Sequence, residues 1–396
     1  MSSMNFMEKL LDGVDVEWKA LGEAGEFIRG NGLQKKDFVE AGFPAIHYGQ
    51  IYTRYGLSAD KTFTFVSEAY ASRLKIAKNN DLLLATTSEN DEDVVKPLAW
   101  LGDEVAISGD MMLFRHKQNV KYLAYFFHTE AFQKQKAKYI TGPKVRRVSS
   151  GDLAKIVVPI PCPNNPKKSL DIQAEIASIL DAFSELTAEL TAELTARKKQ
   201  YSYYRDQLLS FEEGEVEWKT LGEVVKIQRG KRLIKSQLET IGNYAVYQNS
   251  MTPLGYYAES NVKAGTTFVI CAGAAGEIGY STVKFWAADD VHFLVTPDYI
   301  QNKFLYYYIL TQQHKILGQV RRASVPRLSK TVLENIQIPI PNLTEQSRIV
   351  ATLDTFDALT NSISDGLPRE IELRQKQYEY YRDQLFRFPK PEEEVE

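Results

Sequence analysis

Apolar residues recur every three or four positions along two stretches of the sequence, 171–211 and 345–388. The first stretch lacks glycine and proline and is rich in strong helix formers. Its apolar positions are Ile176, Ile179, Phe183, Leu186, Leu190, Leu194, Tyr201, Tyr204, Leu208 and Phe211. The second stretch continues the pattern through Ile349, Leu353, Phe356, Ile363, Tyr378, Tyr381, Leu385 and Phe388. This spacing predicts two long helices that pack against each other as an antiparallel coiled coil.

The second stretch is interrupted by the sequence SDGLP at 364–368. Gly366 suits the end of one helix and Pro368 suits the first turn of another, so we expect a break there.

Two other regions, roughly 31–143 and 231–323, show short apolar runs instead. DLLLATTS at 81–88 and TTFVICAG at 266–273 are typical of buried strands, and DMMLFR and VHFLVTP are typical of further strands. Each pair leads into an aromatic-rich helix, LAYFFHTEAF or FLYYYIL, whose rings we assign to the core rather than to a base-stacking surface. Both regions are therefore predicted to be mixed α/β.

Sequence motifs that flank these two regions occur twice in the chain. VEWKALGE at 16–23 returns as VEWKTLGE at 216–223, and Arg29-Gly30 returns as Arg229-Gly230, both at an offset of 200. KVRRVSSGDLAKIVVPIP at 144–161 matches SVPRLSKTVLENIQIPIP at 324–341, and YYRDQLLSF at 203–211 matches YYRDQLFRF at 380–388. Because Val395-Glu396 corresponds to the start of the second VEWK copy, the duplication is circular, and we expect the termini to lie close together around a pseudo-twofold axis.

These patterns predict an α+β protein in which two dissimilar α/β domains are separated by a long antiparallel coiled coil of two repeated helices. The predicted boundaries are a first domain at 1–158, a central helix at 159–213, a second domain at 214–338 and a C-terminal helix at 339–396.

The central helix contains two consecutive copies of Thr-Ala-Glu-Leu within residues 184–200. Four residues add about 6 Å to a helix and a little more than one turn, which a heptad pattern absorbs as a stutter. The tetrapeptide is thus interpreted as a length module that changes the spacing of the two domains. The alternative is replication slippage without consequence.

The composition fits an ordinary globular, cytoplasmic protein. Cys162 and Cys271 are its two cysteines and lack Cys-x-x-Cys spacing, which is typical of a reducing compartment and excludes a disulfide framework. No run approaches the roughly 18 apolar residues of a membrane span, and the N-terminus lacks the layout of a signal peptide.

The net charge of −3 hides a strong segregation of charge. Residues 111–150 carry nine Lys or Arg and one acid, and residues 301–330 carry six Lys or Arg and no acid. Each basic region ends in a serine-containing loop that leads to an expected helix start, a combination suited to phosphate and guanine edges. The predicted DNA-binding residues of these loops are Lys144, Arg146, Arg147, Ser149, Arg321, Arg322, Arg327 and Ser329. The alternative is that the serines are N-caps and the arginines are solvated.

Two further segments, HYGQIYTR at 47–54 and YQNS at 247–250, place amides, hydroxyls and a guanidinium after expected strands. We regard Tyr48, Gln50, Arg54, Gln248 and Asn249 as candidate base readers.

The sequence contains no recognisable catalytic motif. There is no Gly-x-x-x-x-Gly-Lys-[Ser/Thr] loop, and AGAAGEIG at 272–279 is interpreted as a turn or a close backbone approach rather than a dinucleotide fingerprint. NNPK at 164–167 lacks features of the [Asn/Asp]-Pro-Pro-aromatic methyltransferase motif, and the five histidines form no ligand-spaced pair. Glu17-Trp18-Lys19 and its second copy resemble half of a nuclease site, but we expect them to seat a tryptophan at the scaffold joint.

The whole chain resembles the specificity subunit of type I restriction–modification enzymes. The resemblance rests on the [V/I]PIP…Q…I…LD runs at 158–181 and 338–354, the YYRDQ helices, the two dissimilar regions and the circular repeat. The Thr-Ala-Glu-Leu pair is similar to that of the type IC group.

This resemblance implies a non-catalytic subunit in which each variable domain reads one half of a bipartite, asymmetric DNA site. It implies that the helices act as spacer and as docking surface for two methyltransferase subunits, with restriction and translocase subunits joining the complex. The residues expected in the spacer and docking surface are Leu186, Leu190, Leu194, Tyr201, Tyr204, Phe356, Tyr378 and Tyr381. The chain itself would hold no cofactor or metal, whereas S-adenosylmethionine, ATP and Mg²⁺ would belong to its partners. A scaffold whose two inserts bind two proteins is the alternative interpretation.

Overall fold

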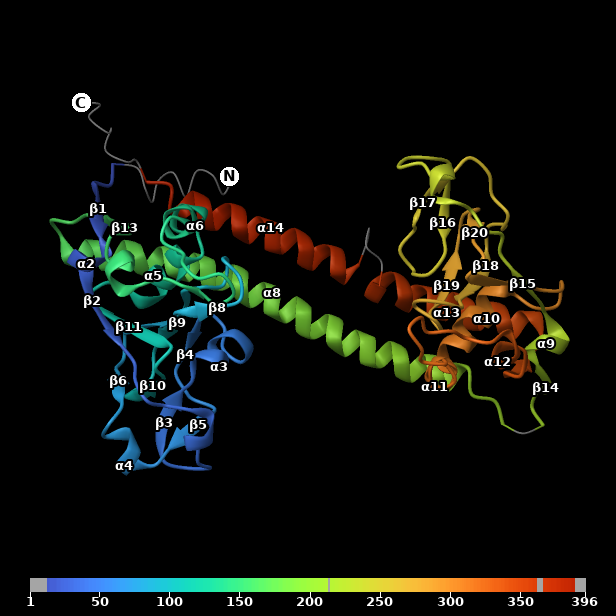
Figure 1. Cartoon of the computed structure of the whole chain (residues 1–396), viewed down its shortest axis with the longest axis horizontal. Coiled ribbons are helices and arrows are strands. Elements are labelled where there is room, and N and C mark those ends of the chain that lie inside the picture. Colours follow the sequence, from blue (N-terminus) through green and yellow to red (C-terminus); the bar gives the residue numbers. More distant parts are fainter. Residues whose placement is uncertain (1–12, 213, 362–365, 389–396) are drawn as a thin grey trace. The chain divides into compact units, whose positions relative to one another are not determined.

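The computed structural model describes residues 13–212, 214–361 and 366–388, and these fall into two compact units (Figure 1). The first unit comprises 13–189 together with 371–388, and the second comprises 190–361 with 366–370. Both ends of the described chain therefore belong to the first unit, in keeping with the circular repeat. The predicted fold class, two α/β domains with a long helix between them, is confirmed.

The first unit contains two main sheets, with strand orders β2-β11-β7-β9-β4 and β5-β3-β10-β6. Its elements are β1 (Val16–Ala20), α2 (Leu21–Ala24), β2 (Gly25–Arg29), η1 (Lys35–Asp37), β3 (Phe43–Ile46), α3 (Tyr48–Thr53), β4 (Ser58–Ala59), β5 (Thr64–Val66), α4 (Glu68–Ala71), β6 (Lys75–Ala77), β7 (Leu82–Ala85), β8 (Thr87–Ser88), β9 (Lys96–Trp100), β10 (Val105–Ile107), β11 (Met111–His116), α5 (Val120–Phe127), α6 (Glu130–Ala137), β12 (Arg146–Arg147), α7 (Ser150–Leu153), β13 (Val157–Pro161) and parts of α8 (Pro166–Leu208) and α14 (Leu367–Leu385).

The second unit repeats the plan with sheets of order β15-β21-β18-β19 and β17-β16-β20. Besides the remaining parts of α8 and α14, its elements are β14 (Glu217–Thr220), α9 (Leu221–Val224), β15 (Lys226–Arg229), η2 (Lys235–Gln237), β16 (Tyr244–Tyr247), β17 (Gly255–Tyr257), β18 (Thr266–Ile270), β19 (Ile278–Ser281), β20 (Trp286–Ala287), β21 (Val291–Val295), α10 (Asn302–Thr311), α11 (Gln313–Gly318), α12 (Lys330–Glu334), β22 (Gln337–Ile340) and α13 (Leu343–Asn361).

The central strands are buried on both faces, which is why their sequences read as unbroken apolar runs. In β7, Leu82 and Leu84 pack with the aromatics of α5, whereas Leu83 faces the opposite cluster, formed with β3, β10 and α3. In β18, Val269 packs towards α10 and Phe268 towards β20. The aromatics of α5 and α10 are thus core residues, as predicted.

The repeated sequence motifs pair with each other inside each unit. β1 is antiparallel to β13, with Trp18 opposite Pro159, and β14 is antiparallel to β22, with Trp218 opposite Pro339. The predicted role of the Glu-Trp-Lys motif in the scaffold joint is confirmed. Trp18 packs on the first core, whereas Trp218 is 40% exposed and lines a hollow of about 720 Å³ beside α10 and α11.

The Q…LD part of each repeat locks the aromatic helix to the long helices. Buried Gln173 accepts a hydrogen bond from the Asn119 N–H at 2.9 Å, and buried Gln346 accepts one from the Gln301 N–H at 2.8 Å. Eight residues after each glutamine, Asp181 or Asp354 binds a lysine and a tyrosine of α5 or α10. The pairs are Lys121 and Tyr125 with Asp181 and Lys303 and Tyr307 with Asp354.

Helix α8 spans 43 residues because it has no proline after its first position and no glycine. Within the first unit, the ring of Phe183 stacks on Tyr381 of α14 at 5.3 Å between centroids. Within the second unit, Tyr204 stacks on Phe356 of α13 at 5.6 Å, and Tyr201 is buried beside the same phenylalanine. The helix break is confirmed: α13 ends at Asn361, Gly366 has a φ of +80°, and α14 begins at Leu367, while Ser364 and Asp365 lie outside the described residues.

Coverage varies among the predicted seam residues. Ile176, Ile349, Leu353, Leu385 and Phe388 are buried, whereas Tyr204 is 39% exposed and Ile363 lies outside the described residues. Leu186 is 37% exposed, and Leu190 and Leu194 are half-buried. The boundary between the units falls between Glu189 and Leu190, inside the repeated tetrapeptide.

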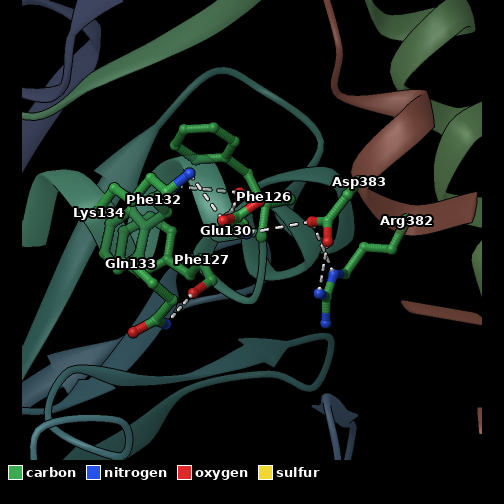
Figure 2. Close-up of polar contacts among 9 residues, drawn as sticks. Phe126, Phe127, Glu130, Phe132, Gln133, Lys134, Arg382 and Asp383 are labelled. Atoms are coloured by element: carbon green, nitrogen blue, oxygen red, sulfur yellow. Dashed lines mark hydrogen bonds and ion pairs between the residues drawn. The ribbon is translucent and has the colours of Figure 1, made fainter. Parts of the chain in front are cut away.

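The C-terminal end of α14 completes the first unit (Figure 2). The Glu130 N–H at the start of α6 donates to Asp383 Oδ1 at 3.1 Å, across 253 positions of sequence, and Glu130 also pairs with Lys134. Phe386 is buried against Tyr122 and Phe126, with ring centroids 4.8 and 5.7 Å apart. The last described residues thus form part of the N-terminal core.

Candidate nucleic-acid interface

The two basic loops fold into matching hairpins at the predicted offset of 180. We call residues 141–147 the first basic hairpin and residues 321–327 the second basic hairpin. The backbones of Thr141 and Arg147 exchange two hydrogen bonds of 2.9 Å, and those of Arg321 and Arg327 exchange bonds of 2.9 and 3.1 Å. The order of exposed and buried positions is the same in 141–150 and 321–330, so equivalent positions of the two hairpins face solvent.

The hairpins present most of their predicted cations to solvent. Lys144, Arg147, Arg321, Arg322 and Arg327 are exposed, and within the described part of the chain none of them is ion-paired.

Arg146 differs from these five cations. It is half-buried, pairs with Asp91 at 2.7 Å and donates to the Gly142 carbonyl. Its charge is thus already partnered, because the acidic segment 89–93 lies beside the hairpin.

The two predicted serines act as helix N-caps. Ser149 Oγ accepts from the Asp152 N–H at 3.1 Å at the start of α7, and Ser329 Oγ accepts from the Thr331 N–H at 3.2 Å at the start of α12. The capping role is therefore the one that these hydroxyls fill in the free chain, and their contact with DNA stays a prediction.

In the first unit the basic hairpin meets two other segments at one end of the main sheet. β12 of the hairpin pairs with β8, so that Arg147 lies opposite Thr87. Helix α3 is attached to the same place, because the Tyr52 hydroxyl lies within hydrogen-bond distance of the carbonyl oxygens of Ala85, Thr87 and Asp93.

The candidate readers of α3 have different environments. Tyr48 is half-buried and lines a hollow of about 350 Å³ with His47, whose pKa is lowered by burial and by Lys35. Arg54 is exposed and lies over the Phe63 ring. Gln50 is only 8% exposed, and its amide is engaged by the His47 N–H and Thr64. The Gln50 side chain therefore faces inward and supports the fold here, although it was selected as a base reader.

The second unit brings the equivalent segments together. The Ala274 N–H donates to the Asn249 carbonyl at 2.9 Å, and the Gly273 N–H donates to the Pro326 carbonyl at 3.1 Å. Asn249 is exposed and Gln248 is half-buried. Gly273 has a φ of +79°, and a Cβ there would lie 2.6 Å from the Asn249 carbonyl oxygen. The prediction that AGAAGEIG is a close backbone approach is confirmed.

Arg29 and Arg229 lie at the same sheet ends and are not among the DNA-binding residues predicted from the sequence. The Arg29 Nε donates to the Gly109 carbonyl, and the Arg229 Nε donates to the Asp289 carbonyl, 180 positions later. Their signal was present in the sequence as the repeated Arg-Gly pair, but the pair alone does not reveal which surface it occupies. We define the first strand-end surface as residues 29, 47–48, 86–88, 109–110 and 147, and the second as 229, 248–249, 271–273, 289–290 and 327.

The reactive groups near these surfaces include the Cys271 thiol of the second unit and nearby carboxylates. Burial raises the pKa of the Cys271 thiol to about 12, so at neutral pH it is a protonated and weak nucleophile. Among the residues that the structure describes, no cluster of His, Cys, Asp and Glu is suited to a metal ion. Within the same residues, no helix has the length and apolar character needed to cross a bilayer.

Residues 13–197 and 213–373 each match the family described as "Type I restriction modification DNA specificity domain". The chain is 39% identical to the "Type I restriction enzyme EcoR124I/EcoR124II specificity subunit" of Escherichia coli over 99% of both chains. It is 31% identical to the E. coli "Type I restriction enzyme EcoprrI specificity subunit" over 92% of this chain and 93% of that one.

Two solved structures share the fold. The S subunit of a type I restriction–modification system from M. genitalium aligns with a TM-score of 0.62 at 16% identity, covering 96% of this chain and 98% of that one. A chain from a study of complex assembly and conformational transition of the type I R-M system aligns with a TM-score of 0.61 at 17% identity, covering 94% and 97%.

Proposed function

Because the chain belongs to the family of type I restriction–modification specificity subunits, we propose that each of its two target recognition domains reads one half of a bipartite, asymmetric DNA site. The observation that carries this proposal is the pair of strand-end surfaces. Both are built from the same backbone connections around an exposed arginine hairpin, but several of their side chains differ, among them those at 47, 48 and 86 and their equivalents at 248, 249 and 271. Two similar frames with unlike side chains are what an asymmetric two-part target requires.

In this proposal the chain is a placement subunit without catalysis of its own. Two methyltransferase subunits dock on the repeated helices and strand pairs, and restriction and translocase subunits join them in the cytoplasm. S-adenosylmethionine, ATP and Mg²⁺ are then bound by these partners. The duplicated scaffold supports a pair of identical partners, because an equivalent strand pair, β1–β13 or β14–β22, occurs in each unit.

The experiment that tests half-site reading uses the assembled complex. Sequencing of modified adenines in DNA from cells that carry the complex first yields its target. Duplexes with the full target, with either half-site alone and with neither are then compared as methylation substrates. We expect efficient methylation of the full site only; equal methylation of a duplex with one half-site would disprove the proposal.

The same duplexes separate DNA reading from the alternative of a protein-binding scaffold. Binding through Lys and Arg releases counterions from DNA and weakens steeply as salt is raised. A scaffold whose two domains bind proteins does not show this dependence on a DNA ligand.

We also propose that the Thr-Ala-Glu-Leu repeats set the gap between the half-sites, as in the type IC group. Deletion of Leu190–Glu193 shortens α8 by about 6 Å, which corresponds to one or two base pairs at about 3.4 Å each. We expect the preferred gap to shorten while both half-sites stay unchanged. Glu193→Gln, which keeps the helix length, is the matched control. Altered half-sites in the deletion variant would refute the spacer role.

A further inference from the structure

We propose that Arg29 and Arg229 each bind a DNA phosphate in their own half-site and so fix the register of each target recognition domain regardless of sequence. This inference rests on the proposed DNA-reading function. It assigns a role to the repeated Arg-Gly pair, which lies outside the predicted site.

The two arginines occupy equivalent places in dissimilar domains. Each ends the edge strand of the main sheet, β2 or β15, and each donates its Nε to the tight turn that precedes the neighbouring strand, β11 or β21. The turns correspond closely: the Met111 N–H donates to the Ser108 carbonyl at 3.1 Å, and the Val291 N–H donates to the Ala288 carbonyl at the same distance.

The turn connects each arginine to the rest of its strand-end surface. In the first domain the Asp110 carbonyl accepts from the Thr86 N–H at 3.0 Å, and Thr87 pairs with Arg147. In the second domain the Asp290 carbonyl accepts from the Cys271 N–H at 2.7 Å, and the next residue, Ala272, forms a bridge with Arg327. Arg29 therefore lies on the same surface as the first basic hairpin, and Arg229 on the same surface as the second.

Each guanidinium keeps unused donors. Of its five N–H groups, the Nε bond uses one. Both residues are exposed, and among the described residues no carboxylate oxygen lies within 4.0 Å of either one. The acidic side chains of this neighbourhood are Asp110 in the first domain and Asp289 and Asp290 in the second. A guanidinium that is held at Nε and free at its two terminal nitrogens is arranged for bidentate phosphate binding.

The glycine after each arginine holds this arrangement in place. A Cβ on Gly30 would lie 2.1 Å from the Ser108 carbonyl oxygen, and one on Gly230 would lie 2.2 Å from the Ala288 carbonyl oxygen. Any other residue would push the strand end away from the turn and move the arginine with it. The pair is therefore retained as a unit in both copies.

The distribution of shared and unlike residues points to phosphate rather than to a base. Around the turn, structural equivalence places His47 with Gln248, Tyr48 with Asn249 and Thr86 with Cys271. These positions differ between the domains, as base-contacting positions must if the half-sites differ. Phosphate contacts carry no sequence information and can stay the same. Arg29 and Arg229 belong to the shared set.

The test measures how the affinity of the assembled complex depends on salt, between about 50 and 200 mM. Two duplexes of equal length are used, one with the mapped target and one of random sequence. Removing one phosphate contact lowers the slope of log K against log salt by about 0.9. We expect Arg29→Ala and Arg229→Ala each to have this effect, to weaken binding about tenfold and to leave the preference for the target unchanged. The double variant should lower the slope by about 1.8.

Two further variants separate contact from folding. Arg29→Lys keeps the charge and should restore most of the slope with a smaller loss of affinity. Lys78→Ala removes an exposed cation that pairs with Glu104 at the opposite end of β7, and it should leave the slope unchanged. Thermal unfolding of each complex confirms that the variants are folded.

The outcomes separate this inference from the proposed function. If the wild-type complex does not prefer the target duplex, the proposed function fails. If the wild-type complex prefers the target but Arg29→Ala weakens binding and keeps the wild-type slope of log K against log salt, the arginine only stabilises the turn. The inference is then overturned. A changed base preference at one half-site in Arg29→Ala would also overturn it, because the residue would then be reading a base.

Discussion

The two target recognition domains are alike where the backbone is anchored, and they differ in several of the other side chains around the strand ends. Both keep the buried glutamine that caps the aromatic helix, the aspartate that binds a lysine and a tyrosine, and the turn that receives the Arg Nε. They differ in the segment after the first strand of the smaller sheet, which is helix α3 in one domain and an open loop in the other. This comparison teaches that the frame fixes where a reading segment sits, and leaves its side chains free to vary.

The domains also differ in how their cores are closed. In the first, the end of α14 supplies Phe386, and in the second the corresponding end of α8 supplies Leu209. The first core therefore depends on a segment from the other end of the chain, whereas the second is closed by the helix that leads into it.

Phe386→Ala should have the largest effect on the difference in stability between the two units. Removing a buried phenylalanine costs about 3 to 5 kcal/mol of unfolding free energy, and here it also detaches the C-terminal segment from Tyr122 and Phe126. We expect hydrogen exchange to accelerate throughout the first unit and to stay unchanged in the second. Leu209→Ala is the matched change and should reverse that pattern. Equal loss of protection in both units would contradict the division of the chain.

Substitution of the buried glutamines Gln173 and Gln346 should have the next largest effect on stability. Gln173→Leu leaves the Asn119 N–H without its acceptor and removes donors to Gln118 and Ser169, so we expect a loss of about 2 to 3 kcal/mol in the first unit. Gln346→Leu should do the same in the second unit. Gln207→Leu, on the exposed face of α8, is the control. Chemical denaturation with domain-resolved exchange measures all three.

The helices, strands and basic hairpins could be predicted from the sequence, but the direction of the side chains on the strand-end surfaces could not. Periodicity and the absence of glycine identified α8, and the unbroken apolar runs identified β7 and β18, because burial on both faces leaves a direct mark on composition. The offset of 180 correctly paired the hairpins. The direction of a side chain could not be predicted from the sequence. Gln50 follows a strand just as Gln248 does, but its side chain points inward and caps α3.

The role of the repeated Arg-Gly pair was hidden for a related reason. Its meaning depends on the turn at 108–110 or 288–290, which lies about 80 or 60 residues away along the chain. A contact over that separation is set by strand order, and strand order is decided by packing rather than by local pattern.

A difference in acid sensitivity sharpens the comparison further. In the first unit, burial lowers the pKa of His128 to about 4, and Arg382, Lys96 and Lys136 lower it too, whereas Asp93 acts in the opposite direction. The unfolded state takes up this proton near pH 6.5, so folding stability falls as the pH drops from 6.5 towards 4, by about 2 kcal/mol at pH 5. The equivalent residue of the second unit is Leu310.

His128→Leu should therefore weaken the pH dependence of the first unit between pH 6.5 and 4 and leave that of the second unit unaltered. The part that remains in the first unit includes the contribution of His116, whose pKa burial also lowers to about 4. Hydrogen exchange of α5 and α6 at pH 7 and pH 5 measures the change. If wild type and variant lose the same protection on acidification, the histidine does not control acid sensitivity.

The smallest expected effect, that of Arg147→Ala on DNA affinity, should be confined to one half-site. Arg147→Ala removes an exposed guanidinium from the first basic hairpin, whose backbone is held by Thr141 and by β8, so the fold should be unaffected. We expect about a tenfold loss of affinity for duplexes in which the half-site of the first domain is intact, equivalent to about 1.4 kcal/mol. Arg327→Ala should cause the same loss through the other half-site. Duplexes that each carry one intact and one scrambled half-site distinguish the two variants. Each variant should lose affinity only for the duplex whose intact half-site is bound by its altered domain. Equal sensitivity of both variants to both half-sites would show that the hairpins act on the duplex as a whole and that the domains do not read separately.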